Sequence, residues 1–341
     1  DQDPQIMADA AQRIGYPVLI KATAGGGGKG MRVVESKDEF TDALAAVLRD
    51  SKKSFGDDRV ILEKYLPEAR HVEVQVFADT QGNVVHLFER DCSMQRRNQK
   101  VIEEAPAPGL SDQVRQEMHD AAINCARSVN YVGAGTVELL LAPDNRFYFM
   151  EMNTRLQVEH PVTEMVTGLD LVEWQLRVAA GESLPLNQDD ITCTGHAMEA
   201  RIYAENPEQG FLPATGSIGL LTTPSTSKNL RIDTGVRQGD EISIHYDPMI
   251  AKLIVHGNDR ESANMALGSG LGQYHVLGLQ TNIPFLRTLC RTDDFSSARL
   301  STRFIERNED SLVHHAVPNQ DLLASIGAAL VCNRSNPVSY T

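Results

Sequence analysis

The segment from 147 to 161, FYFMEMNTRLQVEHP, carries acidic, amide and guanidinium side chains at alternating positions of an apolar strand. In a strand with a period of two, Phe147, Phe149 and Glu151 share one side, and Asn153 and every second residue up to position 159 continue that parity. Carboxylate and amide oxygens suit a hard cation, whereas a guanidinium suits an anion. The segment therefore indicates a metal and anion site, although an ordinary solvated strand face also alternates in this way.

A third carboxylate joins this set from the preceding strand-like run, GTVELLL, which contains Glu138. Mg²⁺ prefers oxygen ligands, so Glu138, Glu151 and Asn153 form a candidate metal site.

A glycine-rich hairpin lies near the start of the chain, where YPVLIKA leads into GGGGKG and then into the apolar run MRVV. Residues 25–30 satisfy GxGxxG, but a dinucleotide fingerprint must open a helix, and here a strand follows. A P-loop is excluded because Met31 and Arg32 follow the glycines. We expect a phosphate-binding flap supported by Lys21 and Lys29, with a simple mobile turn as the alternative.

Two strands around a Leu-Pro corner are expected next, in VILEKYLPEARHVEVQVFAD. The segment from Glu63 to Leu66 offers a backbone edge that can pair with an adenine, and His71 shares a strand face with Glu73. His71 taken alone is more typical of a structural histidine than of a ligand contact.

The following run, ERDCSMQRRNQKVIEEAPAP, mixes basic and acidic residues. For Arg90 and Arg97 a mixed solvated surface is as good an interpretation as a functional one. Lys100 differs, because apolar Val101 and Ile102 follow it immediately, which favours a partly enclosed ammonium beside a core strand.

Composition narrows the classes of function. The chain has 341 residues, 41% hydrophobic and 23% charged, with a formal charge of -14, which argues against a nucleic-acid or membrane binder. With about 150 residues per domain, roughly two domains are expected. The five cysteines form no CxxC pair, so a reducing intracellular compartment fits. The chain has no run of about 18 apolar residues and no signal-like opening, but it starts at Asp1, so a preceding targeting segment stays open.

Taken in order, these motifs resemble the ATP-grasp biotin carboxylases from residue 1 to about residue 308. The matching stretches are KATAGGGGKGMRVV, EKYL, RHVEVQVF, ERDCSMQRR, EEAPAPG, GTVE and EMNTRLQVEHPVTEM. Others, such as GHAMEARIYAE and VRQGDEISIHYDPMIAKL, are most similar to the biotin-containing subunits of acyl-CoA carboxylases. The resemblance implies that ATP activates bicarbonate to carboxyphosphate, whose carboxyl group passes to N1 of biotin.

The resemblance also implies a role for each motif residue. The implied ATP-binding residues are Lys21, Gly27, Gly28, Glu63, Lys64, Leu66, His71, Gln95 and Asn98. The implied ligands of Mg²⁺ or Mn²⁺ are Glu138, Glu151 and Asn153. The implied bicarbonate site consists of Lys100, Arg155, Gln157 and the Val158 backbone. Glu159 is implied as the general base, and Arg231 as the group that stabilises the enolate-like oxygen of biotin. Arg155 and Lys100 are also implied as catalytic residues.

Two departures from the family pattern stand out. The family usually carries His where this chain has Asn98, although Asn still donates and accepts hydrogen bonds. The family's N-terminal lobe of roughly a hundred residues and its AMKM-type biotinylation motif are not in the sequence. We therefore expect weak or no activity from this chain alone, with a biotin carrier domain, a carboxyltransferase subunit and further copies as partners in the full-length protein. The expected compartment is the cytoplasm in a bacterium or the mitochondrial matrix in a eukaryote.

Two alternatives remain. One is another ATP-grasp ligase of the carbamoyl-phosphate synthetase kind, against which RLQVEHPVTEM and Arg231 argue. The other is a catalytically silent assembly module.

The expected fold is α+β, of the ATP-grasp type. We expect a small lid over 1–66, an antiparallel-sheet body with the metal and bicarbonate site over 67–191, a β-rich C-terminal portion over 192–313, and the start of a linker over 314–341. Helices are expected over Pro4–Ile14, Lys37–Asp50, Ser111–Val129 and Leu169–Ala180.

Overall fold

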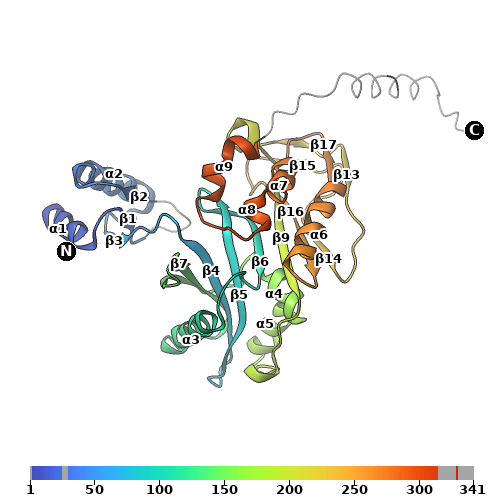
Figure 1. Ribbon diagram of the computed structural model, residues 1–341, viewed down its shortest axis with the longest axis horizontal. Coiled ribbons are helices and arrows are strands. Elements are labelled where there is room, and N and C mark those ends of the chain that lie inside the picture. The colour runs from blue at the N-terminus through green and yellow to red at the C-terminus, as the bar shows by residue number, and fades with distance from the viewer. Residues whose placement is uncertain (1, 25–29, 314–327, 329–341) are drawn as a thin grey trace, which may run out of the picture.

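The computed structural model describes residues 2–24, 30–313 and 328. Helices combine with two main antiparallel sheets, one of three strands and one of eight, which confirms the α+β class. In Figure 1 the small sheet and its helices lie to one side of the large sheet. Among the described residues, no helix combines the length and hydropathy that a membrane crossing requires.

The lid consists of the three-stranded sheet, in the order β2-β1-β3, with two helices packed on it. Its elements are α1 (Pro4–Ile14), β1 (Val18–Ala22), β2 (Met31–Val34), α2 (Lys37–Phe55) and β3 (Val60–Lys64). The side chain of Asp3 caps α1 by accepting from two backbone N–H groups. Helix α2 runs five residues beyond its expected end and stops where Gly56 adopts a left-handed conformation. Ile20, Phe40 and Leu44 are buried between the sheet and the helices.

The large sheet has the order β14-β16-β9-β6-β5-β4-β7-β8, and every neighbouring pair is antiparallel. Its strands are β4 (Arg70–Ala78), β5 (Val84–Arg96), β6 (Gln99–Ala105), β7 (Gly133–Leu141), β8 (Phe147–Asn153), β9 (His196–Tyr203), β14 (Leu230–Thr234) and β16 (Met249–Gly257). Strands on both sides of position 192 thus belong to one sheet. The expected division into units at 66/67 and 191/192 stays a prediction.

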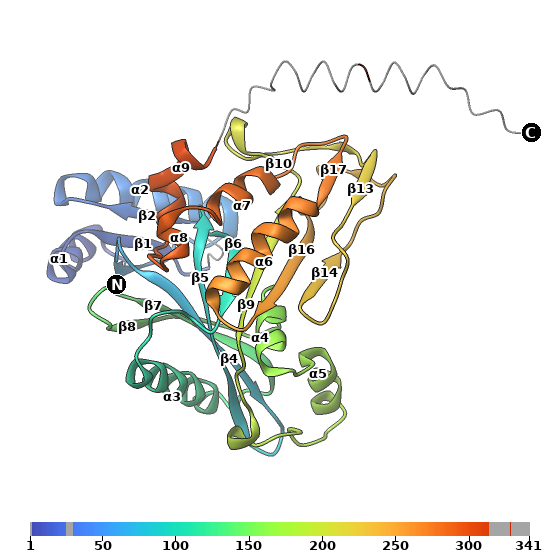
Figure 2. The ribbon, with the colours of Figure 1, turned by 45° about the vertical axis from the view of Figure 1, so that its right-hand side comes forward.

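The two faces of the large sheet are covered by different helices. On one face lie α3 (Asp112–Ser128) and α6 (Arg260–Gln273), packed against alternate apolar residues of β4, β7, β9 and β16. On the other lie α4 (His160–Thr167) and α5 (Leu171–Ala179). Figure 2 shows α4 and α5 beside the lower half of the sheet. The second face also carries the polar residues described below.

The expected helices form with small shifts at their ends. Helix α3 lies one residue inside its expected limits at each end, because Ser111 serves as its N-cap and accepts from Val114 N–H. Helix α5 begins at Leu171, two residues late, because the side chain of Asp170 caps it.

The C-terminal portion, which was expected to be rich in β-strands, also contains several helices. Helix α6 is followed by α7 (Ile283–Leu289), α8 (Asp293–Ser296) and α9 (Phe304–Leu312). Short strands and turns complete it: β10 (Glu205–Asn206), β11 (Leu212–Pro213), β12 (Gly216–Ser217), β13 (Leu220–Thr222), β15 (Glu241–Ile242) and β17 (His275–Leu277), with 3-10 helices at Gln188–Asp190 and Pro207–Gln209. The expected linker over 314–341 lies outside the described residues apart from position 328.

The expected parity of β8 is wrong. The β7–β8 register shifts between Glu138 and Leu139, so Phe149 opposes Leu139 whereas Glu151 opposes Glu138. Leu139 belongs to the core beneath α3, and Glu138 faces the opposite side. The extra residue of the irregularity therefore separates Phe149 from Glu151, which an uninterrupted period of two had placed together.

Candidate active site

Lys100 lies at the centre of a group of buried carboxylates on the polar face of the large sheet. Its Nζ atom, on β6, lies 2.7 Å from Glu73 of β4 and 3.3 Å from Glu138 of β7, and it also bonds the Glu159 carboxylate. The lysine side chain is 12% exposed. Burial alone lowers the pKa of Lys100, but Cys92 and the carboxylates raise it well above its ordinary value. The expected enclosed ammonium is confirmed.

Arg90 donates hydrogen bonds to side chains of this group and its neighbours. It is fully buried, and its guanidinium donates to Glu73 at 2.7 Å, to Gln75 at 2.8 Å and to Gln157 at 3.1 Å. The solvated-surface interpretation is therefore wrong for Arg90. Its hydrogen bonds hold the side chains of Glu73 and Gln157 in place. Arg97, by contrast, is exposed in the turn between β5 and β6.

The predicted metal ligands meet at the edge of the sheet. Glu138 and Glu151 are direct partners in the β7–β8 ladder, and Asn153 opposes Thr136, two residues before Glu138 on β7. Burial opposes ionisation of Glu138, but His71 and Lys100 together lower its pKa to about 2. Two carboxylates and an amide on adjacent strands match the oxygen donors that Mg²⁺ or Mn²⁺ prefers, so the residues fit the ion.

Two tighter groups of potential metal ligands occur among the described residues. Their members lie within 4.8 Å of one another and are His71, Glu73 and Glu138 in one group, and Glu73, Cys92 and Glu159 in the other. Lys100 already donates to carboxylates of both groups. Lys100 bonds Glu138 as well, but among the described residues its hydrogen bonds reach neither Glu151 nor Asn153, so the Glu138–Glu151 edge keeps oxygen donors for a cation.

Apart from Lys100 on β6, the predicted bicarbonate residues lie on the segment between β8 and α4. Arg155 is exposed, and its guanidinium makes long bonds of 3.3 Å to Leu156 O and 3.4 Å to Asn153 Oδ1. Gln157 is buried and donates to Glu138 at 2.7 Å. The carbonyl of Val158 accepts from Lys252 at 2.6 Å, which leaves the Val158 N–H as the group that can meet an anion. Arg155 thus holds an exposed and weakly bonded guanidinium beside the predicted metal face.

The structure places Arg201, rather than Arg231, against Glu159. Arg201 on β9 donates to Glu159 at 2.9 Å and to Glu103 at 2.6 Å. Among the described residues, the ion-pair partners of Arg231 are Glu164 and Asp233, and its side chain is 37% exposed. Arg231 lies on β14 at the sheet edge and is linked to the centre through Asp233 and Lys252.

The predicted nucleotide residues of the lid are more dispersed. Lys21 on β1 lies 3.8 Å from Glu63 on β3, and Lys64 donates to the carbonyls of Gly15 and Tyr16. Leu66 follows β3 in the connection to β4. Gly27 and Gly28 lie outside the described residues.

The remaining nucleotide residues lie in the large sheet. His71 is buried on β4 with its Nε2 atom 3.3 Å from Glu138. Gln95 is buried on β5 and opposes Lys100 in the β5–β6 ladder. Asn98 is exposed in the turn, with φ at 66°. Asn tolerates this left-handed conformation better than most residues do.

Sequence reasoning gave no role to four residues that organise the centre: the buried Glu73, Arg90 and Lys252, and Arg201, whose side chain is 11% exposed. Arg201 and Lys252 each interrupt an apolar strand, in AMEARIY and MIAKLIV. A charged residue inside such a run is rarely buried unless it is paired, so these interruptions were the available signal.

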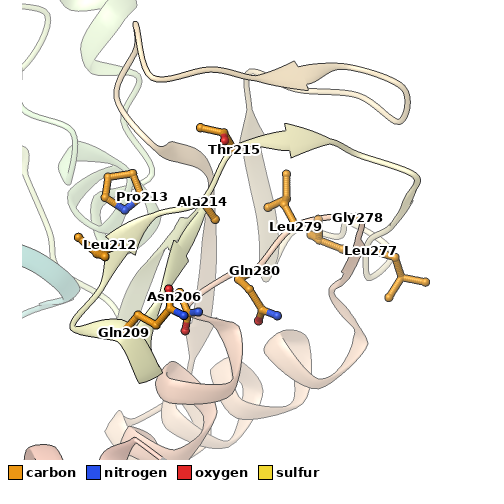
Figure 3. Close-up of a pocket in the computed structure, with 11 residues that line it drawn as sticks. Asn206, Gln209, Leu212, Pro213, Ala214, Thr215, Leu277, Gly278, Leu279 and Gln280 are labelled. Carbon is orange, nitrogen blue, oxygen red and sulfur yellow. The ribbon is translucent and has the colours of Figure 1, made fainter.

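A cavity of about 620 Å³ lies elsewhere, in the C-terminal portion (Figure 3). It is lined by Asn206, Gln209, Leu212, Pro213, Ala214, Thr215 and residues 276–280. Of the described residues predicted for the site, none lines this cavity. The charged centre around Lys100 is the better candidate, because perturbed titratable groups converge there.

Comparisons with known proteins identify the family and the fold of the chain. Residues 2–187 match the family model "Carbamoyl-phosphate synthase L chain, ATP binding domain", and residues 199–307 match "Biotin carboxylase C-terminal domain". The biotin carboxylase domain of Hydrogenobacter thermophilus 2-oxoglutarate carboxylase, in complex with MgADP, ADP and bicarbonate, is 41% identical with a TM-score of 0.89, over 92% of this chain and 69% of that one. Campylobacter jejuni biotin carboxylase is 42% identical with a TM-score of 0.86, over 89% and 68% of the two chains. The fold is therefore the ATP-grasp fold.

Curated relatives narrow the class further. The alpha subunit of mitochondrial methylcrotonoyl-CoA carboxylase from Dictyostelium discoideum is 56% identical over 94% of this chain and 46% of that protein. The one from Rattus norvegicus is 52% identical over 99% and 48%. The chain belongs to the biotin carboxylase family, and it spans about half the length of the curated relatives it matches.

Proposed function

We propose that this chain is the biotin carboxylase component of an acyl-CoA carboxylase and carboxylates biotin with ATP and bicarbonate. The observation that carries the proposal is the arrangement around Lys100, where an oxygen-donor edge, an exposed guanidinium and a carboxylate flanked by two cations lie on consecutive short segments. A bicarbonate ion beside Arg155 meets the nucleotide phosphates at the Glu138–Glu151 edge.

In the first step, an oxygen of bicarbonate attacks the γ-phosphorus of ATP, and the bond to the β–γ bridging oxygen breaks to release ADP. The Arg155 fork holds the bicarbonate, and Glu159 accepts its proton. Glu138, Glu151 and Asn153 would hold Mg²⁺ or Mn²⁺, which neutralises phosphate charge. Lys100 keeps Glu159 in place, since its ammonium also bonds Glu73 and Glu138.

In the second step, the carboxyl carbon of carboxyphosphate bonds N1 of biotin, and phosphate leaves. The N1 proton passes to the departing phosphate, and negative charge develops on the ureido oxygen, so a fixed cation is needed there. We assign this role to Arg201, whose guanidinium reaches Glu159. Arg231, the residue implied by sequence resemblance, stands as the competing assignment.

The lid supplies nucleotide contacts in this proposal. Lys21 and the 25–30 segment meet the phosphates, and the segment from Glu63 to Leu66 meets the adenine. His71, Gln95 and Asn98 complete the nucleotide site from the large sheet. A pair as open as Lys21 and Glu63 is easily rearranged by a triphosphate.

The partners and compartment follow the relatives' names. We propose a biotin carrier domain and a carboxyltransferase subunit as partners, of the methylcrotonoyl-CoA type that the motifs and the 56% identical relative favour. The similar methylcrotonoyl-CoA and propionyl-CoA carboxylase subunits are mitochondrial proteins by name, so a eukaryotic source places this chain in the matrix and a bacterial source in the cytoplasm.

The test is transfer of label from radioactive bicarbonate to biotin, with ATP and Mg²⁺, by the natural full-length protein and by this chain. We expect full-length turnover and weak or absent turnover from the chain alone. Arg155→Ala should abolish labelling, and Arg146→Ala is the matched control, because Arg146 is an exposed arginine paired with Asp144 just before β8. Carbamate formation without biotin would instead support the carbamoyl-phosphate alternative, and full-length protein without either activity would support an assembly role.

A further inference from the structure

Two buried glutamates, one of which bonds Arg201, face each other on neighbouring strands. Glu103 on β6 and Glu199 on β9 are partners in the antiparallel ladder, and both are fully buried. Directly opposed side chains in such a ladder have Cβ atoms about 5 Å apart, and like charges there repel. Two ionised carboxylates would be strongly disfavoured at this position.

The charged groups packed around Glu199 do not neutralise both acids. Arg201, on the same strand, bonds Glu103 and Glu159. Lys252 on β16 lies 3.6 Å from Glu199 and 3.5 Å from Asp233 of β14, while its hydrogen bond goes to the Val158 carbonyl. Glu159 is also bonded by Lys100, and Asp233 by Arg231. Of the four acids that face this point from β6, β9, β14 and the start of α4, Glu199 is thus the one whose cation contact among the described residues is limited to Lys252 at 3.6 Å.

Hydrogen bonding is also incomplete at the pair. Among the described residues, neither oxygen of Glu199 and only one oxygen of Glu103 has a hydrogen-bond partner. A buried acceptor without a donor is costly, and an ionised one more so. A proton on one oxygen of Glu199 turns that oxygen into a donor for the unpartnered oxygen of Glu103, which satisfies two of the three atoms.

We infer that Glu199 carries a proton that it donates to Glu103, and that this neutral Glu199 is a positioning residue for Arg201. Burial first, then the Glu103 charge, raises the pKa of Glu199 well above its ordinary value. Burial also raises the pKa of Glu103, against the lowering effect of Arg201. Loss of the proton would place a second anion opposite Glu103 and beside Arg201, and would draw the guanidinium from Glu159.

The expected effect of Glu199 on turnover rests on the proposed function, whereas its protonation in the folded protein does not. Difference infrared spectroscopy of the intact protein near neutral pH should show the carbonyl stretch of a buried neutral carboxylic acid, lost in Glu199→Gln. The control is Glu104→Gln, because Glu104 lies next to Glu103 on the opposite face, with its charge held by His196 and Arg260. Burial works to raise the pKa of Glu104, but these partners lower it overall. No such band in the wild type, or a band that survives in Glu199→Gln, would overturn the inference.

The kinetic test uses the pH dependence of kcat for biotin carboxylation by the full-length protein. Glutamine keeps the neutral shape and the donor, so Glu199→Gln should stay within about twofold of wild type and move the alkaline limb to higher pH. Glu199→Leu keeps the volume but strands the Glu103 oxygen, so kcat should fall about tenfold or more. Equal losses in both variants with an unmoved alkaline limb would mean that Glu199 acts as an anion. A protein without any carboxylation activity would refute the proposed function while leaving the infrared result to decide the pair.

Discussion

The lid and the large sheet hold their charged residues in opposite ways. In the lid, Lys21 and Glu63 are 3.8 Å apart, and their side chains are 18% and 37% exposed. In the large sheet, Lys100 is bonded to three carboxylates that are nearly or fully buried. The charged side chains of the large sheet are thus held in position before a ligand binds. Those of the lid take their final positions when the nucleotide binds.

The largest effect is expected from Lys100→Met. This change removes the cation shared by Glu73, Glu138 and Glu159 and leaves their buried carboxylates without it. Removing one partner of a buried ion pair lowers the free energy of unfolding by about 3–5 kcal/mol, and we expect a loss of that size. Urea unfolding measures the loss, and biotin carboxylation should disappear with it. A variant of wild-type stability would show that the centre is less fixed than the comparison with the lid requires.

The two arginines of the C-terminal portion give the next largest effect. Arg201→Gln should lower kcat by about 10²–10³, because it removes a cation from the reacting group. Arg231→Gln, its matched control on β14, should cost much less, since Arg231 bonds Glu164 and Asp233 instead. The reverse order of effects would restore the assignment made from sequence resemblance.

Low pH should destabilise the large sheet, because Glu73 becomes protonated. Burial opposes its ionisation, but Lys100 and Arg90 lower the pKa of Glu73 to about 2 from an ordinary value of 4.5. Because the folded pKa is the lower one, the stabilisation is complete above the ordinary value and is lost as pH falls from 4.5 towards 2. The urea midpoint should therefore fall less over this range in Glu73→Gln than in the wild type. Parallel curves for the two proteins would contradict the lowered pKa.

The smallest effect on stability is expected in the lid. Lys21→Ala removes a partly exposed pair, so the unfolding free energy should change by less than about 1 kcal/mol. Affinity for MgATP should nevertheless fall about tenfold, which is about 1.4 kcal/mol of binding. Titration calorimetry measures the affinity, with Lys37→Ala as the control on the exposed start of α2. An unchanged affinity would remove Lys21 from the nucleotide site.

Much of this contrast was predictable from the sequence. The alternation of EMNTRLQVEH placed Glu151 and Asn153 correctly relative to Glu138, and the apolar residues after Lys100 indicated its burial. The register shift in β8 was not predictable, because strand periodicity carries no sign of an extra residue. Arg201 was missed because its partners, Glu103 and Glu159, are 98 and 42 residues away in the chain. Local patterns do not encode which distant strands become neighbours.

The central claim concerns where the nucleotide, the cation and bicarbonate meet. Its most direct test is a crystal structure of the protein soaked with MgADP and bicarbonate. The account predicts a cation bound between Glu138 and Glu151, and an anion on the guanidinium of Arg155 within reach of Glu159. A cation held elsewhere, with Arg155 turned away from the anion, would contradict it.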